Sequence, residues 1–411
     1  MRHAGQHFDI LICGTGFTGL TLATALSKTF EGALKIGLIG PTPDVHATVD
    51  NGRAFALSAT ASQMLQVLGV WARLEGHAQP VRKIEITDSP LEAGVRPVFL
   101  TFNNRLENGL EASFIVPAHA LGQAVTDILN DSQNVAFLQG ADCNEFSSNP
   151  TSVYANIGDQ PLTARLLICA DGRNSKLRKK AGIDTIGWSH NQVGIVTTVA
   201  HEKPHEGVAV QHFLPAGPFA ILPLKGNRSS ITWSENQENA RHMLALSDAD
   251  FLTEVDLRFG GRLGQLSLDG PRNGFTLKTQ IARSYIGDRF ALVGDAAHSV
   301  HPIAGQGLNL AFRDIAALCE CLIEGARVGL DIGEPAALQK YQQWRRFDSM
   351  SAACTFSSLN LLFSQNLTLF RSAREAGLGL VDKISNLKAN FVREAAGVTG
   401  DLPKLMTGVY P

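Results

Sequence analysis

Three glycines near the N-terminus have the spacing of a phosphate-binding turn. Gly14, Gly16 and Gly19 lie in "GTGFTG", between the apolar run "FDILIC" and the helix-like run "LTLATALSKTF". A strand, a glycine turn and a helix in this order present backbone N–H groups and a favourable helix dipole to a diphosphate. Gly14 permits the tight turn, Gly16 lets the diphosphate approach, and Gly19 permits close packing of helix on strand. The turn therefore predicts dinucleotide binding rather than a plain tight turn.

A second glycine-rich turn lies in the C-terminal third of the chain. The apolar run "RFALV" ends at Gly294 and Asp295, and "GQGLNLAFRDIAAL" then has the pattern of an amphipathic helix. A carboxylate here can accept hydrogen bonds from ribose or ribitol hydroxyls, and the first N–H groups of the helix stabilise negative charge. A reduced flavin carries such charge near N1 and O2. The glycines of this segment, Gly294, Gly305 and Gly307, are expected to bring backbone donors to the flavin ring, and Asp295 is expected to hold the sugar-alcohol chain.

Two further stretches favour a composite cofactor site. The apolar run "LLICA" stops at Asp171 and Gly172 before the basic helix "NSKLRKKAGI", which is typical of the ligand-facing edge of an α/β sheet. Arg53 lies where the chain returns past the first turn, and we expect it to contact a phosphate or nucleotide rather than to be a solvated surface residue. Each turn alone also fits a tight turn or a helix-capping aspartate. The three turns together favour cofactor binding.

The composition is that of an ordinary globular protein. The 411 residues suit two or three packed units, with 44% hydrophobic and 18% charged residues. A net charge of −2 without a basic stripe argues against nucleic acid as a partner. The six scattered cysteines predict reduced, structural thiols in a cytoplasmic protein and no metal site. The sequence shows no secretory segment and no run of about 18 apolar residues, which leaves peripheral membrane attachment open.

The elements that must position these turns form an α/β lobe and a second lobe. The N-terminal turn belongs to a βαβ unit that continues into the strand-like run "LKIGLIG". From about Trp188 to Phe275, short alternating runs punctuated by glycine and proline predict an antiparallel sheet. Within it, Pro218 and Pro223 in "GPFAILPL" predict an edge strand or a bent strand. Residues 336–404 have a mostly helical pattern.

The three turns resemble the signatures of class A flavin-dependent aromatic hydroxylases. These signatures are "GTGFTG", "CADGRNSKL" and "LVGDAAHSVHPIAGQGLNLAFRD", and the resemblance covers nearly the whole chain. The stretches "RAFALS", "GPFAILPL" and "REAAGVTGDLPKLMTGVYP" are specifically similar to the ubiquinone-biosynthesis hydroxylase family. The resemblance implies an FAD-dependent monooxygenase with NAD(P)H as co-substrate. O2 would form a C4a-hydroperoxyflavin, which would hydroxylate the aromatic ring of a polyprenylated phenol in ubiquinone biosynthesis.

The patterns and the resemblance together predict the fold class and its division. An α/β, Rossmann-like FAD-binding domain of the glutathione-reductase type is expected over residues 1–75, 104–182 and 277–335. An antiparallel-sheet substrate domain is expected over 76–103 and 183–276, and a helical C-terminal region over 336–411. Such hydroxylases have no separate NAD(P)H domain, and the sequence contains a single dinucleotide fingerprint.

Pro302 and His301 are the residues expected beside the reacting part of the flavin. The resemblance implies that the flavin is lined by Pro302, Gly305, Gln306, Gly307, Leu308 and Asn309. His301 is a candidate to aid deprotonation of the phenol if it reaches the substrate hydroxyl. The resemblance also implies that Asp171 lies near the pyrophosphate. His298 is expected to orient the turn by hydrogen bonds. His212 and the "FAILPL" strand are expected to roof the pocket, although His212 also fits an ordinary strand residue.

Two positions depart from the family pattern. Gly40 stands where an acidic residue usually ends the second strand, with Asp44 or Asp50 as candidate substitutes, and Pro117-Ala118 stands where the family tends to have Glu-Asn. Both departures would weaken contacts with the adenosine half of FAD. They keep open a weakly active flavin-binding subunit of a biosynthetic complex. A hydroxylase of a soluble aromatic compound is the other alternative, and it would need a short polar pocket with an arginine for a carboxylate.

A helical stripe in the C-terminal region raises the question of partners. The stripe consists of Phe356, Leu359, Phe363, Leu367 and Phe370. Core packing explains such a stripe, and the alternative is a face that docks on a membrane or on other ubiquinone-biosynthesis proteins to receive a lipid-tailed substrate. The arginines that flank it, which fit either account, are Arg345, Arg346, Arg371 and Arg374. A homo-oligomer is also open.

Overall fold

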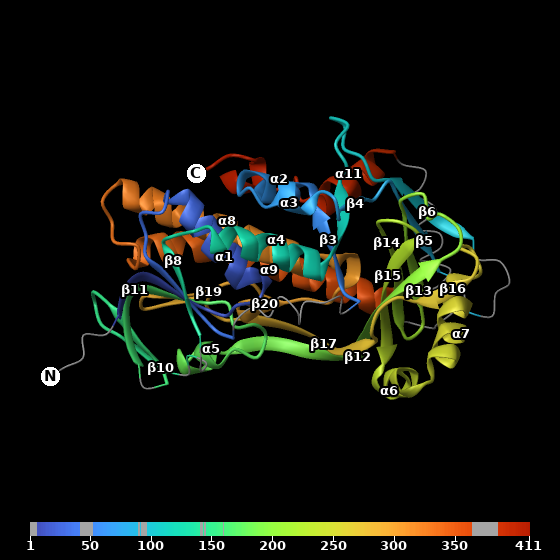
Figure 1. Ribbon diagram of the computed structural model, residues 1–411, viewed down its shortest axis with the longest axis horizontal. Coiled ribbons are helices and arrows are strands. Elements are labelled where there is room, and N and C mark those ends of the chain that lie inside the picture. Colours follow the sequence, from blue (N-terminus) through green and yellow to red (C-terminus); the bar gives the residue numbers. More distant parts are fainter. Residues whose placement is uncertain are drawn as a thin grey trace.

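The computed structural model describes residues 6–41, 52–88, 91, 97–139, 143, 145–158, 160–363 and 385–411. Over these residues the chain forms an elongated molecule with one large sheet towards each end (Figure 1). A small third sheet lies between them and pairs β3 (Ala54–Ser58) with β7 (Ser113–Pro117) and β7 with β4 (Gln79–Pro80).

The first sheet has a parallel core buried on both faces. Its strand order is β18–β19–β11–β1–β2–β8. The parallel strands are β1 (Gln6–Cys13), β2 (Ile36–Ile39), β8 (Val135–Leu138), β11 (Gln160–Cys169) and β19 (Phe290–Leu292). The antiparallel additions are β18 (Ile286–Gly287), β10 (Val153–Ile157) and β9 (Phe146–Ser148). Aliphatic runs such as "ILIC" and "LLIC" form the core strands because helices and the antiparallel arm bury both of their faces.

Four helices pack over one face of this sheet (Figure 1). They are α1 (Phe17–Thr29), α4 (Ala118–Asn130), α8 (Gly307–Arg327) and α9 (Pro335–Phe363). Helix α1 is packed against both α4 and α8, so it is buried almost all round and its sequence is rich in Leu, Ala and Thr. Beyond them lie α2 (Ala59–Val67), α3 (Trp71–Leu74), α11 (Ser385–Ala395) and η3 (Lys404–Thr407).

The second sheet is largely antiparallel and has the order β20–β17–β12–β15–β14–β13–β5–β6, with β16 beside β12. Its strands are β5 (Lys83–Thr87), β6 (Val98–Asn103), β12 (Thr185–His201), β13 (Val208–Leu214), β14 (Gly217–Leu224), β15 (Arg228–Asn236), β16 (Leu266–Leu268), β17 (Asn273–Ala282) and β20 (His298–Ser299). Two helices cover its outer face, α6 (Gln237–Ala245) and α7 (Asp248–Phe259). The long strands β12 and β17 run from this lobe towards the first sheet (Figure 1).

The segment "GPFAILPL" was expected to be an edge strand or a bent strand, and the first of these two expectations is wrong. This segment is β14, which lies between β13 and β15 in the interior of the second sheet. The ladder with β15 begins at Phe219, one residue after Pro218, and the ladder with β13 ends at Ile221, two residues before Pro223. Pro218 is therefore paired with β13 alone and Pro223 with β15 alone. The missing N–H of each proline thus leaves the ladder with the strand on its other side intact.

The predicted division into domains stays a prediction. Its boundary after residue 276 falls within β17, which belongs to the second sheet along its whole length. The chain thus passes between the lobes through continuous strands, without a linker at this point.

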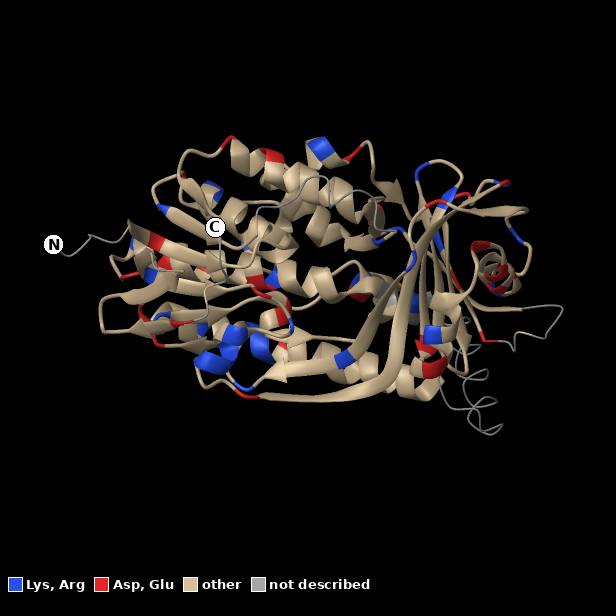
Figure 2. Ribbon diagram, turned by 60° about the horizontal axis from the view of Figure 1, so that its bottom comes forward, with Lys and Arg blue, Asp and Glu red and all other residues tan. Residues whose placement is uncertain are grey.

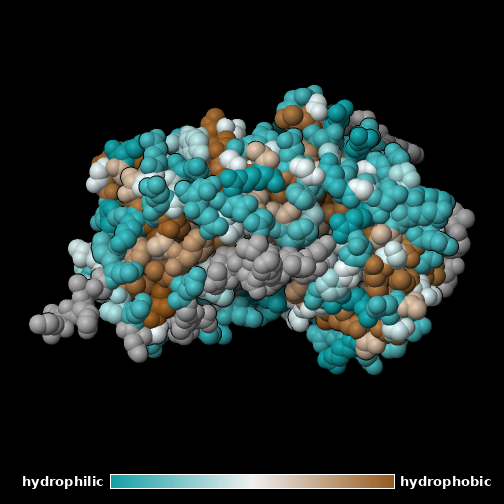
Figure 3. All heavy atoms as spheres, viewed as in Figure 1, coloured by the Kyte–Doolittle hydropathy of each residue, from teal (hydrophilic) through white to brown (hydrophobic). Residues whose placement is uncertain are grey.

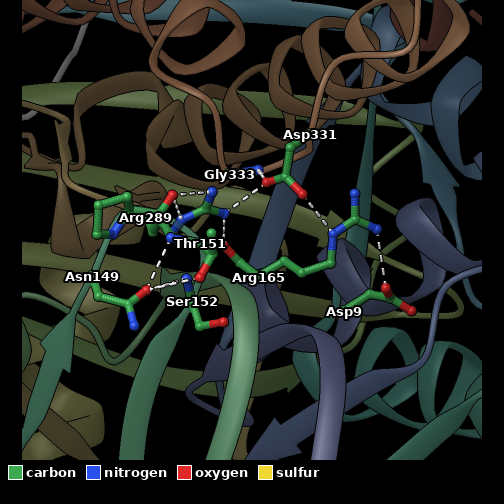
Figure 4. Close-up of polar contacts among 9 residues, drawn as sticks. Asp9, Asn149, Thr151, Ser152, Arg165, Arg289, Asp331 and Gly333 are labelled. Atoms are coloured by element: carbon green, nitrogen blue, oxygen red, sulfur yellow. Dashed lines mark hydrogen bonds and ion pairs between the residues drawn. The ribbon is translucent and has the colours of Figure 1, made fainter.

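An ion-pair cluster fastens the part of the first sheet remote from the turns (Figure 4). Asp331 accepts hydrogen bonds from Arg289 Nη1 at 2.6 Å and from Arg165 Nε at 2.8 Å, and Arg165 Nη1 reaches Asp9 at 3.1 Å. Burial alone would raise the pKa of Asp331, but the two arginines and the N–H of Gly333 outweigh it, so the pKa is lowered. The cluster joins β1, β11 and the segment after α8.

The surface carries both signs of charge, interspersed, apart from Lys and Arg gathered on the short helix α5 (Lys176–Lys180) (Figure 2). The face seen in Figure 3 is mostly hydrophilic, with apolar patches towards both ends of the molecule. None of the helices over the described residues combines the length and the apolar character needed to cross a membrane.

Candidate cofactor and substrate site

The three predicted turns meet at one edge of the first sheet. In the parallel ladder Cys13 is in register with Cys169, and Cys169 with Leu292. The three strands therefore end side by side, and the chain continues from them into the three turns. The structure thus brings together the turns that begin at Gly14, Asp171 and Gly294, as the sequence predicted.

The first turn fits a diphosphate-binding loop. Gly14 has φ of +119°, and a Cβ there would lie 2.3 Å from the carbonyl oxygen of Ala170. A Cβ on Gly19 would lie 1.8 Å from the carbonyl oxygen of Gly14, so both positions exclude any side chain. Gly16 begins α1 as its N-cap and has nothing within 4 Å of its Cβ position. Its backbone is therefore open to a ligand in front of the helix N-terminus.

A cavity of about 1080 Å³ lies in front of these turns. The predicted site residues that line it are Gly16, Arg53, Asp171, Gly172, Asp295, Pro302, Gly305, Gln306, Gly307 and Leu308. The predicted residues that do not line it are Gly14, Gly19, Gly294, His301 and Asn309. The first three of these lie at crowded turns, where a Cβ would meet neighbouring atoms at 2.9 Å or less.

Asp295 and Arg53 carry opposite charges and both line the cavity, where each charge affects the pKa of the other. Both side chains are exposed to the cavity although protein surrounds them. Burial raises the pKa of Asp295, and the neighbouring His298, Arg53 and Arg173 oppose this without cancelling it. Desolvation lowers the pKa of Arg53, whose guanidinium lies 4.7 Å from the ring centroid of Phe55. A carboxylate in such a place can accept hydrogen bonds from sugar hydroxyls.

The N-terminus of α8 opens onto the same cavity. Gly307 is the first residue of α8 and has nothing within 4 Å of its Cβ position. Asn309, two residues on, does not face the cavity: its Nδ2 donates to Ala56 O at 2.9 Å, and its Oδ1 accepts from Ser58 N at 3.0 Å. Asn309 therefore fastens β3 to α8 and holds the wall in place, a different role from the direct flavin contact expected.

A buried charge network, which sequence reasoning missed, supports the turn at Asp295. Asp314 on α8 accepts from Gly294 N at 3.0 Å, from His298 Nε2 at 2.5 Å and from Arg345 Nε at 2.8 Å. Burial alone would raise the pKa of Asp314, but His298 and Arg345 outweigh it and lower the pKa. His298 thus orients the turn, as expected. An aspartate within the apolar run "FRDIAALC" was the signal that could have revealed this network.

His301 lies behind the cavity wall and not on it. Its ring is fully buried, and Nε2 is 3.1 Å from Gln192 Oε1. Desolvation, with the nearby His190, lowers the pKa of His301 to about 3. A buried, neutral imidazole does not reach the substrate space as a base. Pro302, the next residue, does line the cavity.

One of the two departures from the family pattern, Gly40, has a local structural cause. Gly40 has φ of +155°, and a Cβ there would lie 2.8 Å from Thr15 Oγ1, so an acidic side chain does not fit. Ala118 N donates to Arg53 O at 2.9 Å, a backbone bond that Asn would also make, so nothing in the structure explains Pro117-Ala118. Asp44 and Asp50, the candidate substitutes for the missing acid, lie outside the described residues.

The cavity continues beyond the cofactor turns into an arm between the second sheet and the C-terminal helices. The side chains that line this arm are Val81, Ile84, Ile86, Leu100, Phe102, Ile115, Ala209, Phe213, Ala220, Leu222, Leu359, Leu362, Phe363, Phe391 and Val392, with polar Asn104, Ser113, Gln211 and Thr232. The charged residues among the cavity's lining are Arg53, Asp171, Arg173 and Asp295, all on the cofactor side. The described lining of the arm is therefore mostly apolar and carries no charged side chain.

The residues that line this arm test two expectations: that His212 and the "FAILPL" strand roof the pocket, and that the C-terminal helical stripe packs in the core or docks on a partner. Ala220 and Leu222 of "FAILPL" line it, but His212 points to the opposite face of its strand, where Nδ1 lies 2.5 Å from Thr87 Oγ1. Leu359 and Phe363 of the helical stripe also line the arm. Leu367, Phe370, Arg371 and Arg374 lie outside the described residues. Arg345 belongs to the buried network, not to a docking face.

The glycine turn, the open helix N-terminus and the apolar arm define a flavin-dependent monooxygenase, which comparison with known proteins supports. Residues 7–354 match the family model described as an FAD binding domain. The chain belongs to this FAD-binding family of monooxygenases. The predicted fold class, the FAD cofactor and the class of enzyme are thereby confirmed.

The relatives cover nearly the whole chain. The chain is 38% identical to ubiquinone hydroxylase UbiL of Rhodospirillum rubrum over 98% of its own length and 93% of that protein. It is 29% identical to 3-demethoxyubiquinol 3-hydroxylase of Escherichia coli K12, covering 96% of this chain and 99% of the relative. Among solved structures, p-nitrophenol 4-monooxygenase PnpA of Pseudomonas putida DLL-E4 matches with a TM-score of 0.76 and 18% identity, over 95% of this chain and 98% of the other. That last likeness establishes the fold.

Proposed function

We propose that the chain hydroxylates the aromatic ring of a polyprenylated phenol in ubiquinone biosynthesis, with FAD, NAD(P)H and O2. Bound FAD would supply the redox chemistry, in which NAD(P)H provides two electrons, one oxygen atom of O2 enters the ring and the other leaves as water. The names of the full-length relatives support the pathway. The apolar, uncharged arm supports the class of substrate, and it is the observation on which the proposal rests.

The residues of the chain would hold the cofactor at both ends. The turn from Gly14 to Gly19 and the start of α1 would bind the diphosphate, and Asp295 would accept hydrogen bonds from the sugar-alcohol hydroxyls. The N-terminus of α8 at Gly307 would stabilise negative charge on the ring system. The walls of the arm would exclude water from the place of reaction.

The lining of the arm favours a lipid-tailed substrate over a soluble aromatic acid. A carboxylate would need a buried positive partner, and the described residues of the arm supply none. A prenyl chain would gain about 0.8 kcal/mol for each methylene buried there. Such a substrate resides in lipid, so we also propose that the protein receives it at a membrane surface or from a partner protein.

Substrate comparison tests this function. FAD-loaded protein is given NAD(P)H and either a phenol with a prenyl tail or the same phenol without it, and NAD(P)H oxidation and hydroxylated product are measured. We expect the tailed phenol to have the lower KM by at least tenfold. Equal values, or a preference for the tailless phenol, would refute the lipid substrate.

A matched pair of variants localises the effect. Leu222→Glu places a charge in the arm, whereas Leu257→Glu places one on an exposed apolar residue of α7. We expect the first to raise the KM for the tailed phenol and to leave FAD content unchanged, and the second to change neither. The quinone intermediate that accumulates in a deletion strain, identified by mass spectrometry, would name the substrate.

A further inference from the structure

A buried hydrogen-bond chain joins the wall of the apolar arm to the loop beside the flavin. Asn360 on α9 donates through Nδ2 to Gln192 Oε1 at 3.1 Å. The same Gln192 oxygen lies 3.1 Å from His301 Nε2. Asn360, Gln192 and His301 are each at most 6% exposed. The three residues come from α9, β12 and the loop after β20, so the chain crosses three separate elements.

The donors and acceptors in this chain are fixed. Gln192 Nε2 donates to Ala216 O at 2.7 Å, so its amide cannot turn over without losing that bond. Its Oε1 is therefore the acceptor, and His301 must carry its proton on Nε2. Because the three side chains are buried, a displacement of Gln192, or of Asn360 that binds it, would disturb the hydrogen bond that holds the His301 ring.

Each end of the chain lies next to a part of the cavity. Leu359, Leu362 and Phe363 line the apolar arm, and Asn360 belongs to the same turn of α9. At the other end, Pro302, which follows His301, lines the cofactor side, and Pro302 O accepts from Gly305 N at 3.0 Å. Phe363 also stacks on Phe213 with ring centroids 3.8 Å apart, so the end of α9 is held against both β13 and β12.

We propose that Asn360 and Gln192 are positioning residues that couple occupation of the apolar arm to the placement of the Pro302–Gly307 loop against the flavin. A prenyl tail that contacts Leu359 and Phe363 would shift the last turn of α9. This shift would move Gln192 through its hydrogen bond with Asn360, and Gln192 would in turn move His301 and the adjacent Pro302. The coupling rests on the proposed function, because it assumes that a lipid tail fills the arm.

A ligand without an aromatic ring tests the coupling. Farnesol, a prenyl alcohol, can fill the arm but has no ring to stack on the flavin. It is titrated into FAD-loaded protein, its binding is measured by calorimetry, and the flavin absorption spectrum is recorded at each step. We expect farnesol to bind the wild-type protein and to perturb the flavin spectrum.

Asn360→Leu keeps the branched shape and the number of heavy atoms of the side chain, and it removes the donor to Gln192. We expect this variant to bind farnesol within about threefold of the wild-type Kd and to lose most of the spectral change. Asn360→Ser, which shortens the side chain, gives a second variant with the same expected result if the first does not fold. Gln342→Leu is the matched control, since this amide on α9 binds Ser284 and Tyr285 instead.

The outcomes are distinct. Farnesol that binds both wild type and Asn360→Leu with equal spectral change overturns the coupling and leaves the proposed function standing. Farnesol binding to the wild-type protein without any spectral change also overturns the coupling and leaves the proposed function standing. Failure of farnesol to bind the wild-type protein overturns the lipid-filled arm and the coupling with it. Loss of the spectral change in the Gln342→Leu control would show a general effect of α9 and also overturn it.

Discussion

Asp314 on α8 accepts a hydrogen bond from the backbone N–H of Gly294 at 3.0 Å, so a fully buried carboxylate holds the turn that carries Asp295. The same carboxylate neutralises Arg345, which is also fully buried. The cofactor side of the cavity is therefore shaped by a buried ion pair that does not itself line the cavity.

Asp314→Asn should destabilise the protein strongly. The change leaves the guanidinium of Arg345 buried without its main counter-charge, which typically costs about 3–5 kcal/mol in the free energy of unfolding. Asp348→Asn is the control, because Asp348 also contacts Arg345 but is partly exposed. Denaturant unfolding of both variants checks this, and an equal, small effect would show that Asp314 does not carry the turn.

Asp295→Ala should weaken FAD binding without unfolding the protein. A hydrogen bond to a charged group is worth about 1.5–3 kcal/mol, so the Kd for FAD should rise about 10- to 100-fold. Asp288→Ala, at an exposed position in the preceding turn, serves as the control and should bind FAD normally. FAD titration of the apo-proteins measures both, and an unchanged Kd for Asp295→Ala would remove this residue from the site.

Alanine at Gly14 and at Gly16 should have different effects. At Gly14 the new Cβ would collide with Ala170 O, so we expect the apo-protein itself to lose stability. At Gly16 the Cβ meets nothing within 4 Å, so apo-protein stability should change by no more than about 1 kcal/mol while FAD binding weakens. Thermal unfolding with and without FAD separates the two, and identical profiles would argue against a diphosphate at this turn.

His301 should make stability depend on pH below neutrality. Its pKa is about 3 in the folded protein, against about 6.5 for an unfolded histidine. Between these values the unfolded state binds the extra proton, so the stabilisation present above about pH 6.5 falls by about 1.4 kcal/mol per pH unit as the pH drops. His301→Asn should lack this contribution. Unfolding free energies of both proteins at pH 7 and pH 5 test it, and parallel pH profiles would mean that His301 is not held neutral.

The cofactor turns could be predicted from the sequence because their signals are local. The glycines of "GTGFTG" and the carboxylates Asp171 and Asp295 each follow directly on an apolar strand, and parallel strands end at a common edge. Sequence periodicity carries no such signal for contacts between distant elements. The Asp314–Arg345 pair depends on how α8 packs against α9, and the burial of His301 depends on Gln192, 109 residues away in the chain.

The interior position of β14 was missed for a related reason. Prolines at 218 and 223 indicate an edge when the neighbouring strands are unknown. The structure shows that the ladders on the two sides of β14 are offset, so each proline falls outside one of them. That offset is set by the turns that join β13, β14 and β15.

Oxygen transfer to a tailed phenol tests the central claim most directly. FAD-loaded protein is supplied with NAD(P)H, isotopically labelled O2 and a prenylated phenol, and the product is analysed by mass spectrometry. The account predicts one labelled oxygen atom on the aromatic ring, formed at a rate that falls when Leu222 is changed to Glu. NAD(P)H oxidation that yields hydrogen peroxide alone, with no label in the phenol, would contradict it.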